Sequence, residues 1–133
     1  MTPIRAAVLA TAVAGAVIAT YLTYTHYAHV APICTSGGCE KVQHSRYAEL
    51  AGIPVAVLGL IAYCALAATA FRRGVTAATA GVVIALGGAG FSAYLLWAQL
   101  GPIGAICQWC VANDVVIAIA ALLSLVRLAT EPS

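Results

Sequence analysis

Four of the five cysteines in this 133-residue chain form two closely spaced pairs, and they are the side chains most able to do chemistry. The first pair is Cys34 and Cys39, in Cys-Thr-Ser-Gly-Gly-Cys, and the second is Cys107 and Cys110, in Cys-Gln-Trp-Cys. Cys-x-x-Cys is the common spacing of redox-active dithiols. Closing either short loop would add little stability, because a disulfide stabilises a chain mainly by constraining long unfolded loops. We therefore interpret the pairs as centres of thiol–disulfide exchange rather than as purely structural disulfides.

A structural zinc site is the other use of two cysteine pairs. Three histidines could complete such a site: His26, His29 and His44. We expect no metal, because one pair borders an apolar run and the other is expected to face an oxidising compartment, where disulfides persist. The fifth cysteine, Cys64, lies in the middle of an apolar run and is interpreted as a buried, small hydrophobic residue.

The elements that must position the cysteines are membrane-spanning helices. Hydrophobic residues make up 63% of the chain and charged residues 8%, whereas a soluble domain has about 45–50% and about 25%. The apolar runs are continuous and have the length, roughly 20 residues, that a helix needs to cross a bilayer. We predict an all-α integral membrane bundle of four transmembrane helices, with residues 1–133 as one domain. The predicted spans are residues 6–27, 53–71, 75–100 and 103–128, with an extracytoplasmic loop over 28–52.

The basic residues predict how this bundle lies in the membrane, because positive charge is enriched in cytoplasmic loops. In a four-span layout, Lys41 and Arg46 fall on one side and a larger group falls on the other. That larger group is Arg5, Arg72, Arg73 and Arg127. We therefore predict a multi-pass protein of the plasma (inner) membrane with cytoplasmic N- and C-termini. Both cysteine pairs then lie at the extracytoplasmic face.

This layout places the two cysteine pairs in a chemical order. A pair in the external loop can meet a soluble protein, and a pair at the lipid boundary can meet a carrier dissolved in the membrane. Thiol–disulfide exchange moves two electrons from one pair to the next through a mixed disulfide. A quinone takes up two electrons and two protons on becoming a quinol. The architecture thus predicts thiol oxidation coupled to quinone reduction, and we expect no nucleic-acid partner.

At these residues the chain resembles the vitamin K epoxide reductase family over essentially its whole length. The resemblance is carried by Cys34-Thr-Ser-Gly-Gly-Cys39, Ser45-Arg46-Tyr47 with Gly52-Ile53-Pro54, and Cys107-Gln-Trp-Cys110. It implies that Cys110 faces the quinone and that Cys107 exchanges disulfides with Cys39. Cys39 and Cys34 would form the shuttle pair that takes electrons from a partner thiol. Ser45 would position the loop or bond near the quinone, unless it only caps a helix.

The resting connectivity of these cysteines stays open. One arrangement joins Cys34 to Cys39 and Cys107 to Cys110, and the other is the interloop bridge between Cys39 and Cys107. Many bacterial relatives carry a fused thioredoxin-like domain after the bundle. This chain ends at Ser133, so the resemblance implies a prokaryotic-type homologue whose thiol partner is a separate protein.

Two positions depart from the mammalian members of that family. Their second helix carries an Asn that binds the naphthoquinone carbonyl, and about Val55 takes its place here. They also carry a Tyr four residues past the last active cysteine, and that position is Asp114 here. These differences favour the prokaryotic reading over vitamin K epoxide or quinone reduction, which remains the alternative.

Asp114 is also the residue that membrane physics singles out. In a continuous helix Cys107, Cys110 and Asp114 stand at i, i+3 and i+7, on one stripe. An ionisable residue inside a span is a functional candidate, because burying its charge is costly. Asp114 could relay protons to a quinone or hydrogen-bond its oxygen, or it could be satisfied by neighbouring hydroxyls. Together with Ser45 and Trp109, it makes up the candidate quinone-binding set.

We therefore predict a quinone-dependent thiol oxidoreductase that supports disulfide bond formation. Its partner would be a soluble extracytoplasmic thioredoxin-like (DsbA-type) protein. Its acceptor would be a quinone of the menaquinone, ubiquinone or phylloquinone type. The non-enzyme alternative is a small four-span transporter or structural membrane subunit, in which the cysteines would be dispensable.

Overall fold

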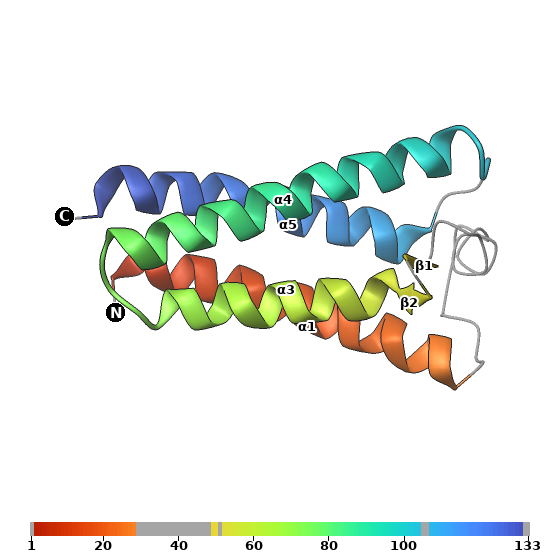
Figure 1. The fold of residues 1–133 in the computed structure, drawn as a ribbon, viewed down its shortest axis with the longest axis horizontal. Helices are drawn as coiled ribbons and strands as arrows, with labels where there is room; N and C mark the ends of the chain where they lie inside the picture. The colour runs from red at the N-terminus through yellow and green to blue at the C-terminus, as the bar shows by residue number, and fades with distance from the viewer. Residues whose placement is uncertain (1, 29–48, 51, 105–106, 132–133) are drawn as a thin grey trace.

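The computed structural model describes residues 2–28, 49–50, 52–104 and 107–131. Within these ranges the chain forms an antiparallel bundle of four helices (Figure 1). The helices are α1 (Pro3–Tyr27), α3 (Val55–Ala70), α4 (Val75–Leu100) and α5 (Gln108–Thr130). Two short strands, β1 (Glu49–Leu50) and β2 (Ile53–Pro54), pair antiparallel before α3. The predicted all-α architecture is confirmed for this part of the chain.

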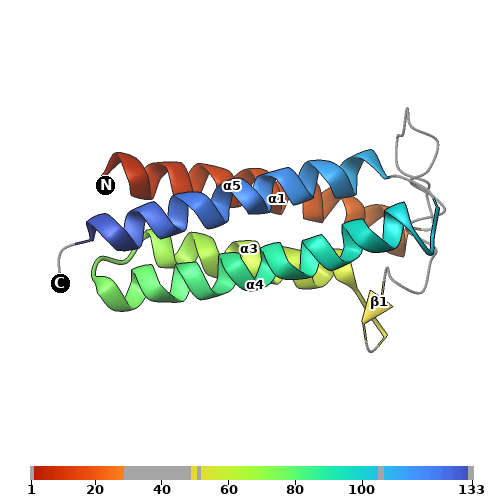
Figure 2. The ribbon, with the colours of Figure 1, turned by 90° about the horizontal axis from the view of Figure 1, so that it is seen from above.

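The start of α1 and the end of α5 lie at one end of the bundle, and the start of α5 lies at the other end (Figures 1 and 2). Of the helices in the described ranges, α1, α4 and α5 are long and apolar enough to cross a membrane. α3 has 16 residues, or about 24 Å at about 1.5 Å per residue, against the roughly 30 Å of a hydrocarbon core. The predicted second span, 53–71, is wrong at its start, because Ile53 and Pro54 pair with β1 instead of entering the helix. The predicted loop over 28–52 lies almost wholly outside the described residues.

The third and fourth predicted spans differ in how well they match the helices. α4 has the predicted bounds, 75–100, with Gly74 and Gly101 as its cap residues. α5 begins at Gln108 rather than at residue 103. Gly104 takes a φ of +66°, which interrupts a right-handed helix. The helix therefore starts later than the apolar run does.

Small residues form the inside of the bundle and larger apolar residues form its outside. The alanines with 0% exposure are Ala12, Ala70, Ala85, Ala98 and Ala120. The large apolar residues that are more than 60% exposed on the helix sides include Val17, Ile61, Val83 and Leu122. Lipid tails are as apolar as these side chains, so membrane helices associate through close packing of small residues. The distribution is that of a bundle solvated by lipid.

Tyr63 crosses the middle of the bundle and joins three helices. Its ring, 2% exposed, packs directly over Gly15 of α1. Its hydroxyl donates a hydrogen bond to Oδ1 of Asn113 on α5, at 2.6 Å. A Cβ atom at Gly15 would overlap the Tyr63 ring, so α1 can approach α3 this closely only with glycine at this position.

The Gly15→Ala substitution is therefore expected to destabilise the bundle by about 1–3 kcal/mol, the range for overpacking a tight core. Thermal unfolding in detergent micelles measures the effect as a lower midpoint temperature. Gly87→Ala on α4 is the matched control, because a Cβ there would meet nothing within 4 Å. Equal midpoints for the two variants would contradict the close contact between α1 and Tyr63.

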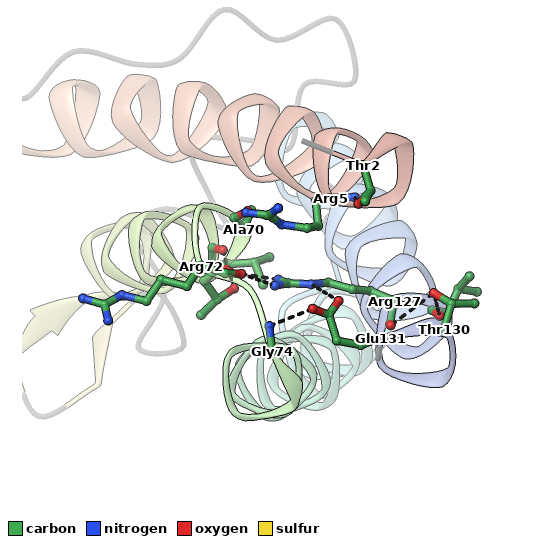
Figure 3. Close-up of polar contacts among 11 residues, drawn as sticks. Thr2, Arg5, Ala70, Arg72, Gly74, Arg127, Thr130 and Glu131 are labelled. Carbon is green, nitrogen blue, oxygen red and sulfur yellow. Dashed lines mark hydrogen bonds and ion pairs between the residues drawn. The ribbon is translucent and has the colours of Figure 1, made fainter. Parts of the chain in front are cut away.

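Two buried arginines hold the C-terminal end of α3 (Figure 3). Arg5 of α1 donates from Nε to the carbonyl of Ala70 at 2.9 Å. Arg127 of α5 donates from its two terminal nitrogens to the carbonyls of Thr69 and Arg72, at 2.9 and 2.6 Å. The last carbonyls of a helix have no intrahelical partner. The two side chains therefore satisfy groups that the short α3 would otherwise leave without a donor.

Glu131 brings α4 into the same network (Figure 3). One of its carboxylate oxygens accepts the N–H of Gly74 at 2.7 Å, and the other lies 3.7 Å from Nε of Arg127. We call Arg5, Arg127 and Glu131 the arginine clasp. The clasp joins all four helices at the end of the bundle where α1 begins and α5 ends. This end also holds every basic residue of the larger predicted group: Arg5, Arg72, Arg73 and Arg127.

Candidate functional site

The second cysteine pair straddles the start of α5, at the end opposite the clasp. Cys107 is the N-cap residue, has an extended backbone (φ −99°, ψ 117°) and is 0% exposed. Its carbonyl accepts the N–H of Val111 at 3.0 Å, the first turn of the helix. Cys110 is the third helical residue and is half-buried. The prediction that Cys107 lies within the helix is therefore wrong, and only Cys110 and Asp114 share a helical stripe.

Gln99, in the last turn of α4, holds the backbone of Cys107. Its side-chain Oε1 accepts the N–H of Cys107 at 2.8 Å, and Gln99 itself is 2% exposed. The connection between the two helices is anchored nearby, because Ile103 donates its N–H to the carbonyl of Ala98 at 2.8 Å. A buried N–H needs an acceptor, and here an amide side chain supplies it.

The surroundings of the pair are apolar and aromatic. Cys107 belongs to a buried cluster with Ala98 and Ile103, and Trp109 and Cys110 pack against this cluster. The Trp109 ring lies 4.9 Å from the ring of Tyr21, centroid to centroid, at a tilt of 49°. The contact joins the start of α5 to the end of α1. Apolar and aromatic side chains packed in this way exclude water from the pair.

Asp114 lies one helical turn beyond Cys110 and is half-buried. The Ser92 hydroxyl of α4 makes a side-chain hydrogen bond with the Asp114 carboxyl. The other carboxyl oxygen, Oδ2, is buried and has no hydrogen-bond partner among the described residues. Buried polar atoms are normally satisfied, so this carboxyl oxygen, on the helix that carries Cys110, is a candidate for contact with a ligand.

The polar residues around Asp114 form a layer across the bundle that the sequence alone did not reveal. Ser92 comes from α4, Tyr63 comes from α3, and Asn113 precedes Asp114 on α5. Each is a polar residue inside an apolar run, and burying such a group is costly without a partner. That cost is the signal by which these residues, and Gln99 with them, could have been found.

The comparison with known proteins agrees with this geometry. A family model described as "Vitamin K epoxide reductase family" matches residues 6–125 of the chain. The chain belongs to the vitamin K epoxide reductase family. The match includes all four helices except the first residues of α1 and the last residues of α5.

Membership of the vitamin K epoxide reductase family makes the protein a membrane oxidoreductase of a quinone-linked family. The predicted family is thereby confirmed, and so are the general class of oxidoreductase and the membrane environment. A transporter or a purely structural membrane subunit is the rejected alternative.

Not every residue that the sequence singled out can be placed in the structure. Cys34, Cys39 and Ser45 fall outside the described residues, as do His29 and His44. Cys64 is exposed on α3, so the interpretation of it as a buried residue is wrong. Among the described residues no three His, Cys, Asp or Glu side chains are grouped to hold a metal ion.

Proposed function

We propose that this member of the vitamin K epoxide reductase family is a quinone-dependent thiol oxidoreductase that supports disulfide formation in exported proteins. Electrons would pass from a thioredoxin-like partner to Cys34 and Cys39, then to Cys107 and Cys110, and then to a membrane quinone. The observation that carries the proposal is the buried Oδ2 atom of Asp114, which has no hydrogen-bond partner among the described residues. Asp114 lies one helical turn from Cys110 on α5.

The proposed cycle conserves atoms and electrons at each step. A dithiol of the partner protein becomes a disulfide, and the Cys34–Cys39 disulfide becomes a dithiol. Exchange then reduces the Cys107–Cys110 disulfide and restores the bridge in the loop. The reduced pair gives two electrons and two protons to the quinone, which leaves as a quinol, and Cys107 and Cys110 rejoin.

The residues at the start of α5 fit a quinone substrate. Trp109 and Tyr21 supply aromatic surface, and the buried cluster beside them excludes water. A quinone has two carbonyl oxygens that accept hydrogen bonds and take up protons on reduction. A protonated Asp114 carboxyl can supply both needs through its open Oδ2, while the Ser92 hydroxyl holds the other side of the group.

We also propose that all four helices cross the plasma (inner) membrane, with the arginine clasp at the cytoplasmic end of the bundle. Positive residues gather at the clasp end, where Arg72 and Arg73 are exposed, and positive charge is enriched on the cytoplasmic side. The cysteine pair at the start of α5 then faces the extracytoplasmic side, where an exported thiol protein can reach the loop.

The experiment that tests the proposal uses the purified protein in lipid nanodiscs. A reduced thioredoxin-like protein and one quinone are added, and quinone absorbance is followed beside disulfide formation in the thiol protein. We expect one quinol for each new disulfide, with ubiquinone, menaquinone and phylloquinone as separate arms. Thiol oxidation that needs no quinone, or no reduction of any of the three, would overturn the proposal. Consumption of vitamin K epoxide in a fourth arm would favour the vitamin K alternative.

Replacing Asp114 with Asn is expected to slow quinone reduction about 100-fold, because a general acid contributes about 10²–10⁴-fold to a proton-transfer step. Asn keeps the size of Asp but cannot donate a carboxylic proton. Transfer of electrons from the thiol protein to the cysteines, measured in a single turnover without quinone, should be unchanged. Unaltered quinone turnover in Asp114→Asn would remove Asp114 from the reaction.

A further inference from the structure

We propose that Gln99 is the positioning residue of the redox pair, and that its amide oxygen holds Cys107 outside α5 so that a Cys107–Cys110 disulfide can form. The inference rests on the proposed function, because it concerns the pair that would reduce the quinone. Gln99 lies on α4 and itself takes no part in electron transfer.

The first step of the argument is burial. Cys107 is 0% exposed and Gln99 is 2% exposed, so water does not serve the Cys107 N–H or the amide oxygen facing it. The two atoms meet at 2.8 Å. An N–H buried without an acceptor is strongly unfavourable. Removing the Gln99 oxygen would therefore force the backbone at Cys107 to find another acceptor.

The second step is the alternative acceptor that the chain offers. In a longer α5, the N–H of Cys107 would bond to the carbonyl of residue 103, as i to i−4 bonding requires. Apolar residues continue back to Ile103, which is why the sequence predicts a helix from there. The Gln99 side chain accepts the same N–H of Cys107 that the longer helix would need for its own hydrogen bond. Its hydrogen bond, with the positive φ of Gly104, thus stops α5 at Gln108.

The third step is the geometry of a disulfide. Within a helix every Cβ is tilted toward the N-terminus, so two side chains three residues apart point the same way. A disulfide instead needs the two Cβ atoms about 3.8 Å apart with a torsion near 90°. Cys107, with its extended backbone outside the helix, is free of that helical constraint, whereas Cys110 stays within it. Extending α5 would strain the bridge and favour the dithiol.

Reduction of the pair conserves electrons and protons. The Cys107–Cys110 disulfide takes two electrons and two protons from dithiothreitol, giving two thiols and oxidised dithiothreitol. Gln99 is unchanged by the step. Its effect would appear in the equilibrium constant between the two states of the pair.

The test measures that equilibrium directly. The full-length protein carries Cys34→Ser, Cys39→Ser and Cys64→Ser, so that only the pair at the start of α5 titrates. It is equilibrated in nanodiscs with mixtures of reduced and oxidised dithiothreitol, and free thiols are counted by labelling and mass. Gln99→Leu removes the acceptor oxygen, and Gln99→Glu keeps one at similar size as the matched rescue.

We expect Gln99→Leu to shift the equilibrium about tenfold toward the dithiol, which is about 30 mV for a two-electron couple. Gln99→Glu should stay within about twofold of the parent, because it keeps an acceptor for the Cys107 N–H. A Leu variant equal to the parent would overturn the inference, and so would equal shifts in both variants. Those two outcomes leave the proposed function standing. If the parent pair forms no disulfide at any ratio, the proposed function fails together with the inference.

Discussion

Replacing Cys110 with Ser is expected to lower quinone reduction by about 1,000-fold or more, because removing a reacting nucleophile costs at least this much in enzymes. Cys110 lies inside the first turn of α5, beside the apolar cluster and one turn from Asp114. Its thiol is proposed to face the quinone, and a serine hydroxyl can neither form a disulfide nor pass on two electrons. Quinone absorbance in nanodiscs, with a reduced thioredoxin-like protein as donor, measures the loss.

The control for this prediction lies within the same chain. Cys64 is exposed on α3 and takes no part in the proposed path, so Cys64→Ser should turn over like the unaltered protein. The change from sulfur to oxygen is the same in both variants, so any general effect of the substitution cancels. Full activity in Cys110→Ser would contradict the assignment of the redox centre. Full activity together with lost activity in Cys64→Ser would move that centre to α3.

Replacing Arg127 with Met is expected to destabilise the bundle by about 3–5 kcal/mol, the cost of breaking a buried charged network by removing one partner. Arg127 is 1% exposed and donates to the carbonyls of Thr69 and Arg72 (Figure 3). Met has a similar length but no donor, so these carbonyls and the carboxylate of Glu131 would lose their partner. The result should be a large drop in the thermal unfolding midpoint in detergent.

Arg73→Met provides the matched control for the arginine clasp. Arg73 is exposed in the connection between α3 and α4, at the same end of the bundle, and exposed charges contribute about 0–1 kcal/mol. Below its unfolding midpoint, Arg127→Met should still reduce quinone, because the clasp lies at the end of the bundle opposite the start of α5, and Cys110 is in the first turn of that helix. Equal midpoints for the two variants would show that the clasp does not stabilise the bundle.

The buried hydrogen bonds of the arginine clasp could not be predicted from the sequence. Arg5 and Arg127 look like ordinary flanking charges of two apolar runs, and from the sequence they serve only to predict orientation. Only the structure shows that both side chains are buried and donate to carbonyls at the C-terminal end of α3. The sequence shows an apolar run from 53 to 71 but does not show that its first two residues join a strand pair.

The same limit applies at the redox centre. The spacing of Cys107 and Cys110, and the ionisable Asp114 a turn further, are visible in the sequence and single out the site. The sequence does not show which of these residues lies in the helix, because this depends on a contact from another helix. Gln99 is eight residues away in sequence and buried against Cys107 in space.

The sequence by itself determined that this is a helical membrane protein of a quinone-linked redox family, because composition, the length of apolar runs and cysteine spacing are local properties. It also determined the bounds of α4, which glycines cap at both ends. Only the tertiary structure decided where α3 and α5 begin and which side chains form hydrogen bonds with Cys107 and Asp114. Those outcomes depend on which buried donors and acceptors meet across helices, and only packing brings such partners together.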